Sequence, residues 1–280
     1  MRLTVVMPCL NEAETLQGCI LKVKHFFTKS AIEGEIIVAD NGSTDGSIAI
    51  AEKEGVKVVH VPTKGYGSAL RNGIKAATND FIIMGDSDDS HDLENLEAFV
   101  EALNKGADLV IGNRFKGGLS KKDMSPLHRY VGNPILTGLG NLFFKTKIGD
   151  FHCGLRGFTK SAFKKMELTT DGMEFASEMI VKAKLNKLQI VEVPTKVFPS
   201  GRSRAPHLNT WKDGWRHLRF LLLYSPRWLF FLPGLAMMLL GLVFIGYHFI
   251  TSVLLPEQLL LSCGTLEGFI KSSITVSKYL

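Results

Sequence analysis

An uncharged, apolar segment near the C-terminus constrains this chain more than any other feature. Residues 228–255 contain no Asp, Glu, Lys or Arg. A helix needs roughly 20 apolar residues to cross the hydrocarbon core of a bilayer, and backbone groups in lipid must find their hydrogen-bond partners within the protein. The segment therefore predicts one transmembrane helix over 228–255. A helix buried in a protein core is the alternative interpretation of this composition.

A basic segment directly precedes the apolar one. Residues 196–227 hold seven Lys and Arg against the single acid Asp213, and this excess equals the net charge of +6 of the whole chain. Such a block is typical of proteins that bind nucleic acid or a membrane surface. Because the block adjoins an apolar span, we favour a membrane partner and no nucleic acid. The positive-inside rule then predicts a plasma-membrane protein whose N-terminal part is cytoplasmic.

The basic block also carries a helical pattern. An apolar stripe lies beside a basic stripe, their members being Trp211, Trp215, Leu218 and Leu222, and Lys212, Arg216 and Arg219. This pattern predicts an amphipathic helix over 206–227 that lies on anionic lipid, with an ordinary core-facing helix as the alternative. Residues 256–280 are apolar only in patches. We expect them to form a tail, at most a partial second membrane segment.

Cysteine usage and the start of the chain exclude other classes of protein. The four cysteines, Cys9, Cys19, Cys153 and Cys263, form no CxxC pair, which argues against a disulfide scaffold and a thiolate zinc site. The first residues run into a β-rich segment without the pattern of a signal peptide. We therefore expect the N-terminal domain, residues 1–205, to fold in the cytosol.

Residues 1–112 alternate β-rich apolar runs with amphipathic helical patterns. The predicted strands cover 3–7, 35–40, 56–60, 81–84 and 108–111, and the predicted helices cover 12–28, 47–54, 68–77 and 93–103. Repeated βαβ units of this length predict an α/β fold with a doubly wound, mostly parallel sheet. Ligands of such sheets bind beyond the carboxyl ends of the strands. The loops that follow the strands are therefore the candidate site.

Polar loops follow four of the predicted strands, at 8–12, 40–46, 64–68 and 85–90. Each loop alone could be a turn or a helix cap, and their glycines do not form the GxGxxG pattern of dinucleotide binding. The acidic run Asp86, Asp88 and Asp89 is harder to explain in this way, because three carboxylates in four residues repel one another. A hard divalent cation that keeps phosphate oxygens and waters as further ligands would offset the repulsion. We predict Asp86 and Asp88 as metal ligands.

The order and spacing of several motifs resemble a known family. The motifs are PCLNE, ADNGSTDG, KGYGSALRNGI, GDSDD and GNRF, followed by DFHCGLR, EFASE, and EVP leading to GRS. This set resembles the family 2 glycosyltransferases with the GT-A fold. Within that family it is most similar to the dolichyl-phosphate mannosyltransferase type, which includes bacterial polyprenyl-phosphate glycosyltransferases. The resemblance covers residues 1 to about 205.

The resemblance implies a donor site for a UDP- or GDP-hexose. Its nucleotide-binding residues would be Pro8, Asn11, Glu12, Asp40, Asn41, Lys64 and Asp86. Asp40 would accept a hydrogen bond from the base, and Asp86 and Asp88 would hold Mg²⁺ or Mn²⁺ on the diphosphate. The family often has Asp where this chain has Asn41, and Gln as a third metal ligand where it has Ser90. These departures bear on the base contacts and on the metal site.

The resemblance also implies a polyprenyl phosphate as the acceptor. A sugar hydroxyl needs a general base, whereas a lipid phosphate is already anionic and needs cations to hold it, a task for which arginine is suited. Arg114 and Arg129 match the acceptor-phosphate arginines of the family, and Arg202 lies in its mobile loop near the phosphates. The expected reaction is in-line attack on the anomeric carbon with inversion, in which Asp88, Arg114 and Arg129 are the catalytic residues.

Other interpretations of the sequence stay open. Asp150 or Glu178 could serve as a base toward a hydroxyl acceptor, such as a glycolipid or a polysaccharide. A processive synthase would carry a QxxRW motif, which residues 224–228, YSPRW, mimic with Tyr in place of Gln. A non-catalytic, membrane-bound nucleotide-binding protein is a further alternative. The sequence does not decide the sugar, the nucleotide, the length of the lipid, or whether the protein is a homo-oligomer.

Overall fold

The computed structural model describes residues 2–118, 127–204 and 210–254, and the chain forms two compact units, Met1–Ser225 and Pro226–Leu280. The seven strands are β1 (Arg2–Cys9), β2 (Glu33–Asp40), β3 (Lys57–His60), β4 (Phe81–Met84), β5 (Leu109–Asn113), β6 (Arg156–Thr159) and β7 (Ile190–Pro194). The helices of the first unit are α1 (Leu16–Lys29), α2 (Ser47–Lys53), α3 (Tyr66–Lys75), α4 (Glu97–Asn104), α5 (Asn133–Phe144), α6 (Lys160–Met166), α7 (Phe175–Leu185) and α8 (Thr210–Leu223). A π-helical turn, His128–Gly132, leads into α5.

One mixed sheet forms the centre of the first unit, with the strand order β3-β2-β1-β4-β6-β5-β7. All pairs are parallel except those of β6, which runs antiparallel to β4 and β5. From β1 the chain moves outward to β2 and β3 and then returns to β4 on the other side of β1. The carboxyl ends of β1 and β4 therefore meet at the point where the strand order reverses, which is where open α/β sheets bind ligands.

The predicted α/β fold and its mostly parallel sheet are confirmed, and all five predicted strands are present within a few residues. The inner strands are continuous apolar runs because helices cover the sheet. In β1 the residues from Leu3 to Met7 are buried, and β4 and β5 are buried almost throughout. Right-handed crossovers place α1 and α2 on one face and α3 on the other, in agreement with the contacts of α1 with α2 and of α3 with α7.

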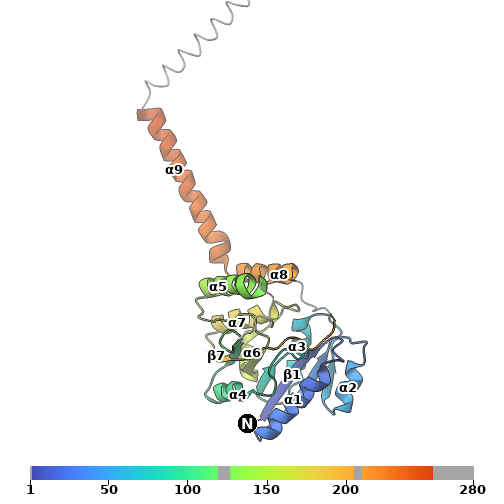
Figure 1. Cartoon of the computed structure of the whole chain (residues 1–280). Coiled ribbons are helices and arrows are strands. Elements are labelled where there is room, and N and C mark those ends of the chain that lie inside the picture. The colour runs from blue at the N-terminus through green and yellow to red at the C-terminus, as the bar shows by residue number, and fades with distance from the viewer. Residues whose placement is uncertain (1, 119–126, 205–209, 255–280) are drawn as a thin grey trace, which may run out of the picture. The chain divides into compact units, whose positions relative to one another are not determined.

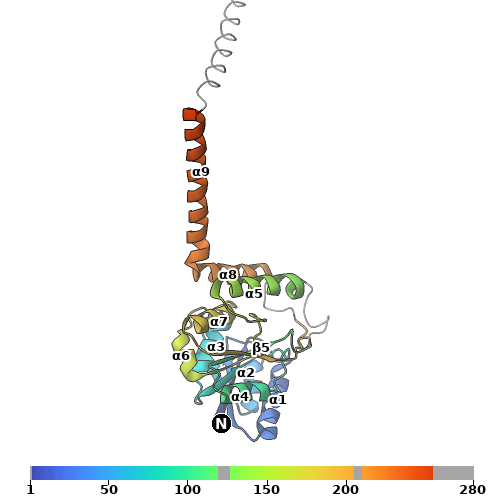
Figure 2. The same ribbon diagram turned by 90° about the vertical axis from the view of Figure 1, so that its left-hand side faces the viewer.

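Helices α5 and α8 lie side by side at the end of the first unit that is opposite its N-terminus (Figures 1 and 2). Helix α8 confirms the helical pattern of the basic block, but the predicted apolar stripe is divided between two environments. Trp211 and Trp215 are 80% and 61% exposed, whereas Leu218 and Leu222 are partly buried. The buried face of α8 consists of Asp213, His217, Phe220 and Leu221.

The second unit is described over a π-helical turn, Arg227–Phe231, and the helix α9 (Leu232–Leu254). Residues Arg227–Thr251 are long and apolar enough to cross a membrane by length and composition, and none of the most apolar window is buried. The alternative of a core helix therefore finds no support in the described part of this unit. The predicted tail over 256–280 lies outside the described residues.

Candidate active site

The segment that follows β7 lies against the acidic loop that follows β4. The backbone N–H of Phe198 donates to the carbonyl of Ser90 at 2.9 Å, and the N–H of Gly201 donates to the carbonyl of Asp88 at 3.1 Å. The Ser200 hydroxyl donates to the same carbonyl at 3.2 Å. We call residues 196–204 the strap. These bonds bring the N-terminal end of the basic block to the carboxyl end of β4.

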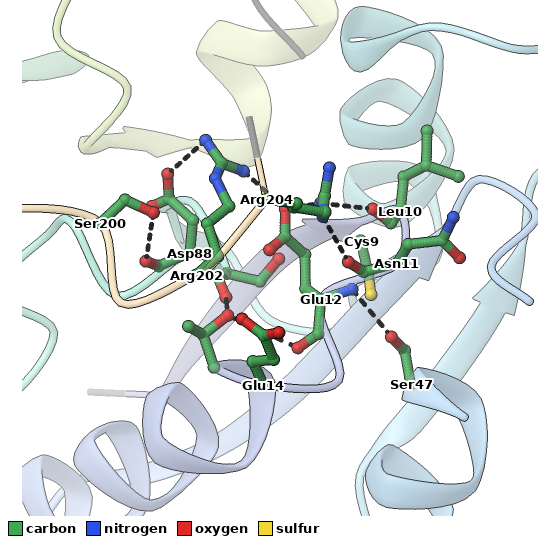
Figure 3. Close-up of polar contacts among 12 residues, drawn as sticks. Cys9, Leu10, Asn11, Glu12, Glu14, Ser47, Asp88, Ser200, Arg202 and Arg204 are labelled. Carbon is green, nitrogen blue, oxygen red and sulfur yellow. Dashed lines mark hydrogen bonds and ion pairs between the residues drawn. The ribbon is translucent and has the colours of Figure 1, made fainter. Parts of the chain in front are cut away.

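Two strap arginines pair with the acids at the ends of β1 and β4 (Figure 3). Arg202 contacts Oε1 of Glu12 at 2.8 Å and Oδ2 of Asp88 at 3.1 Å. Arg204 contacts the same Glu12 oxygen at 2.6 Å and donates to the carbonyls of Leu10 and Asn11 at 2.8 and 2.9 Å. The sequence assigned Arg202 to the acceptor phosphate, and the structure places its guanidinium between two residues of the predicted donor site.

Glu12 is buried between the first two strand ends. Its backbone N–H donates to the Ser47 hydroxyl at 2.9 Å, which fixes the loop after β1 against α2. Its Oε2 is buried without a hydrogen-bond partner among the described residues. Burial raises the pKa of Glu12 even though Arg202 and Arg204 oppose the shift. A buried carboxylate oxygen that lacks a donor is expensive, so this oxygen marks a position where a ligand donor or a cation fits.

Asp86 is held by the side chains of Tyr66 and His91. The Tyr66 hydroxyl donates to its Oδ1 at 2.9 Å, and His91 Nε2 lies 3.1 Å from its Oδ2. Burial raises the pKa of Asp86, but the contacts with His91 and Tyr66 outweigh it and the pKa is lowered. Gly154 makes room for this cluster, because a Cβ there would lie 2.7 Å from Oδ2 of Asp86.

The acidic run does not form a single repelling cluster. Asp86 is paired as described, Asp88 faces Arg202, and Asp89 forms an ion pair with Lys22 of α1 at 2.6 Å. Across residues 2–118, 127–204 and 210–254, no three His, Cys, Asp or Glu side chains are grouped closely enough to hold a metal ion. The donor set fits a hard cation that uses one or two carboxylates and takes its other ligands from phosphate and water. It does not fit a cation held by protein alone.

The loops after β2 and β3 support each other. Both oxygens of Asp40 accept backbone N–H groups, from Gly42 at 3.1 Å and Ser43 at 3.0 Å. The Asn41 amide donates to the carbonyls of Val61 and Thr63, and its oxygen accepts the N–H of Gly65 at 2.7 Å. An aspartate could not donate these two bonds. The chain therefore uses the amide at this position to shape the loop after β3.

The remaining residues of the predicted donor site lie in the same group of loops. Asn11 has a left-handed backbone (φ 57°), and its side-chain oxygen accepts the N–H of Thr44 at 2.7 Å. The carbonyl of Pro8 accepts the Ser87 hydroxyl at 2.7 Å, and Lys64 Nζ donates to the carbonyl of Asn41 at 2.6 Å. The four polar loops thus converge at one edge of the sheet, as the sequence predicted.

Arg114, the residue after β5, is gripped by Asp150. Its Nε and Nη2 donate to the two carboxylate oxygens at 2.6 and 2.8 Å, and its backbone N–H also donates to Oδ2. The Asp150 side chain is fully buried. Burial raises its pKa, but the Arg114 guanidinium more than reverses the shift, and the pKa of Asp150 is lowered. The lowered pKa makes Asp150 a weak base, and Arg114 occupies both of its oxygens. Asp150 is therefore poorly suited to take a proton from a hydroxyl.

Both carboxylate oxygens of Glu178, the other candidate base, are also occupied by hydrogen bonds. Its two oxygens accept the backbone N–H and hydroxyl groups of Thr169 and Thr170 at 2.7 to 3.1 Å, and Lys182 lies 2.9 Å away. Burial raises the pKa of Glu178, but the Lys182 and Thr170 contacts prevail and lower it. Glu178 anchors the loop that precedes α7.

Arg129 lies on a different element from Arg114. It belongs to the π-helical turn His128–Gly132, where its guanidinium carbon lies 5.5 Å from the centre of the Tyr130 ring. Its place at the acceptor phosphate stays a prediction.

Several residues at the site carried little or no signal in the sequence. Arg204 could have been found, because in an extended segment residues i and i+2 point to the same side and Arg202 was already assigned. Tyr66 lies in a loop that was singled out, but its hydroxyl contact with Asp86 depends on how α3 packs on β1 and β2. His91 follows the acidic run without any pattern that links it to Asp86.

Comparisons with known proteins agree with this geometry. A family-wide sequence model described as Glycosyl transferase family 2 matches residues 4–167. The chain is 39% identical, over 86% of its length, to the low-salt glycan biosynthesis hexosyltransferase Agl6 of Haloferax volcanii, of which it spans 58%. It is 31% identical, over 69% of its length, to a dolichol-phosphate mannosyltransferase of Pyrococcus furiosus, of which it spans 56%.

Solved structures share the fold at lower identity. Glucosyl-3-phosphoglycerate synthase from Mycobacterium tuberculosis in complex with phosphoglyceric acid has a TM-score of 0.61 and 22% identity, covering 80% of this chain and 79% of that one. The same enzyme in complex with Mn²⁺, UDP and glucosyl-3-phosphoglycerate has a TM-score of 0.60 at 21% identity, covering 80% of this chain and 79% of that one. At this identity the likeness supports the fold alone.

Proposed function

The chain belongs to glycosyl transferase family 2, and from this premise we propose that it transfers a hexose from a UDP- or GDP-sugar to a polyprenyl phosphate at a membrane surface. The two curated relatives carry hexosyltransferase and dolichol-phosphate mannosyltransferase names. Because the chain spans little more than half of each, their activities guide the proposal without fixing it.

The hydrogen bonding of the carboxylates on the acceptor side is the observation that favours a phosphate as the acceptor. The bases that a hydroxyl acceptor would need, Asp150 and Glu178, are both buried and saturated by hydrogen bonds. An acceptor that arrives as an anion needs no base. It needs a fixed cation, and the guanidinium of Arg114, oriented by two bonds to Asp150, supplies one with N–H groups to spare. These contacts favour a phosphate over a hydroxyl.

On the donor side, the proposal assigns the diphosphate to the edge formed by Glu12, Asp88 and Arg202. A divalent cation held by Asp88 together with phosphate oxygens would stabilise the negative charge of the departing nucleoside diphosphate. Arg202 would turn from Asp88 toward the diphosphate, since both are anions within its reach. With Arg114 holding the acceptor phosphate, attack from the opposite side of the sugar would invert the anomeric carbon.

Three features support work at a membrane. Helix α8 exposes Trp211 and Trp215 next to the basic residues Lys212, Arg216 and Arg219, all of them exposed. Its neighbour α5 exposes Ile135 and Leu142, and the turn before it exposes Tyr130. Aromatic and basic side chains together suit the interface of anionic lipid. We assign α9 to the membrane by its length and composition, with the catalytic unit in the cytoplasm at the cell membrane.

The test uses the purified full-length chain in detergent with Mn²⁺ and undecaprenyl phosphate. A panel of radiolabelled UDP- and GDP-hexoses is offered, and label is counted in the organic phase. The proposal predicts label from one donor and its loss with EDTA. Release of nucleoside diphosphate without labelled lipid would contradict the acceptor and leave the family assignment intact. Nucleotide binding without any turnover would favour a non-catalytic protein.

A further inference from the structure

The carboxylate of Glu192, in β7, is a hub of hydrogen bonds beside the acceptor arginine. Its Oε1 accepts three N–H groups, from the Asn113 side chain at 3.1 Å, the Gly149 backbone at 2.8 Å and the Asp150 backbone at 3.1 Å. Its Oε2 lies 3.3 Å from Lys116 Nζ, and the side chain is only 11% exposed. Three donors on one oxygen is an unusually dense arrangement for one carboxylate.

Two of the three N–H donors, Asn113 and Asp150, belong to residues that support Arg114. Asn113 is the last residue of β5 and directly precedes Arg114, so its position sets where the Arg114 side chain begins. Asp150 carries the carboxylate that grips the Arg114 guanidinium. Glu192 therefore links Asn113, which precedes Arg114 in the chain, to Asp150, whose carboxylate binds the Arg114 guanidinium.

The packing around Gly149 shows how closely these segments approach. A Cβ at Gly149 would lie 2.6 Å from Nδ2 of Asn113 and 3.6 Å from both carboxylate oxygens of Glu192. A side chain there would displace the Asn113 amide from the position in which it donates to Glu192. The close approach is therefore a fixed part of the arrangement around Arg114.

Strand pairing does not account for Glu192. β5 and β7 are already joined along their length, with Ile111 opposite Glu192 in the register. At the other end of the same two strands, Asp108 makes the ordinary kind of link, accepting the N–H of Gln189 at 2.8 Å. The Glu192 carboxylate instead joins the end of β5, through Asn113, to a loop outside the strand pair, through Gly149 and Asp150. That loop is the one that fixes Arg114.

We propose that Glu192 is a positioning residue for the acceptor: by holding Asn113 and Asp150 it fixes the Arg114 guanidinium where the phosphate of the acceptor binds. This inference rests on the polyprenyl-phosphate acceptor proposed above. Without Glu192, three N–H groups lose their acceptor and the Asp150 loop loses its tether. Arg114 would then keep its charge and lose its fixed place.

The experiment compares Glu192→Ala, Glu192→Gln and the matched control Asp108→Ala in the full-length protein. Steady-state kinetics are measured separately for undecaprenyl phosphate and for the nucleotide sugar. We expect Glu192→Ala to lower kcat/KM for the lipid phosphate by about 10- to 100-fold, the scale of a misplacement of about 1 Å. KM for the nucleotide sugar should change by less than about twofold, because within the described part of the chain no hydrogen bond or ion pair of Glu192 reaches the donor loops.

The glutamine variant separates positioning from folding. Its carbonyl oxygen can accept the same N–H groups, so Glu192→Gln should recover most of the activity. It still lacks the Lys116 ion pair and the charge-assisted bonds, so we expect kcat/KM for the lipid phosphate to stay about threefold to tenfold below that of the wild type. An equal rise in KM for both substrates, wild-type kinetics in Glu192→Ala, or the same defect in Asp108→Ala would overturn the inference. A wild-type protein that does not use lipid phosphate would refute the proposed acceptor itself.

Discussion

The two sides of the site neutralise their charges in different ways. On the donor side, the acids Glu12 and Asp88 meet arginines of the strap, a segment that reaches them from beyond the last strand. On the acceptor side, Arg114 meets Asp150, a fully buried carboxylate that is itself tethered by Glu192. In the proposed mechanism the donor-side pairs exchange when a cation or a diphosphate binds, whereas the ion pair of Arg114 with the fully buried Asp150 stays in place. We therefore propose that one half of the site adjusts to its ligands and that the other half is fixed before they bind.

Replacing the adjustable acid should have the largest effect. We expect Asp88→Ala to abolish transfer, with a loss above about 1,000-fold, because Asp88 is the residue through which both the cation and Arg202 act. The matched control is Asp89→Ala in the same acidic run, since Asp89 faces Lys22 of α1 and should cost less than about tenfold. Radiolabel transfer measures both. Similar losses in the two variants would show that the acidic run acts as a structural unit.

We expect the next largest effects from two arginine variants, each of which should weaken the binding of a different substrate. Arg202→Ala should raise KM for the nucleotide sugar by about tenfold, because its contacts lie with Glu12 and Asp88 and one charge-assisted contact is worth about that much. Arg129→Ala should instead raise KM for the lipid phosphate by a similar factor. Lys105→Ala, an exposed change at the end of α4, serves as the control. If Arg202→Ala affects the lipid phosphate alone, Arg202 belongs to the acceptor after all.

The smallest effect concerns stability, through the inner face of α8. His217 is buried, its Nδ1 lies 2.8 Å from the Ser177 hydroxyl, and burial lowers its pKa from 6.5 to about 4. Between these values the unfolded chain binds a proton that the folded chain does not, so stability falls as the pH drops below 6.5. The free energy of unfolding should fall by up to about 1.4 kcal/mol per pH unit.

Thermal unfolding of the wild type and of His217→Asn at pH 7 and pH 5 checks this dependence. The variant should be less stable at pH 7 and should lose less stability on acidification. A pH dependence that is the same in both proteins would show that His217 does not titrate with unfolding.

The convergence of the loops on the proposed donor side could be predicted from the sequence because its information is local. Each of its loops directly follows a strand, and β1 to β4 are short apolar runs separated by amphipathic helices. Parallel strands bring their carboxyl ends to one edge, so Glu12, Asp40 and Asp86 had to converge once the βαβ pattern was recognised. The family resemblance then assigned their roles.

The acceptor side could not be derived in the same way. β6 is four residues long and enters the sheet antiparallel between β4 and β5, and no alternation in its sequence announces it. Arg114 directly follows β5, Glu192 lies in the paired strand β7, and Asp150 comes from the loop before β6, so the three residues lie far apart in the chain and meet only in the folded sheet. The sequence therefore offered Asp150 as a base, and tertiary packing converts it into the anchor of an arginine.

The most direct test of the proposed phosphate acceptor compares two lipids that differ only in the phosphate. The full-length enzyme is given its labelled nucleotide sugar with either undecaprenyl phosphate or undecaprenol, at equal concentration in the same detergent. An acceptor side built from a fixed arginine and saturated carboxylates predicts glycosylated lipid with the phosphate and none above background with the alcohol. Glycosylation of the alcohol at a comparable rate would mean that a base acts in this site, and it would contradict the account.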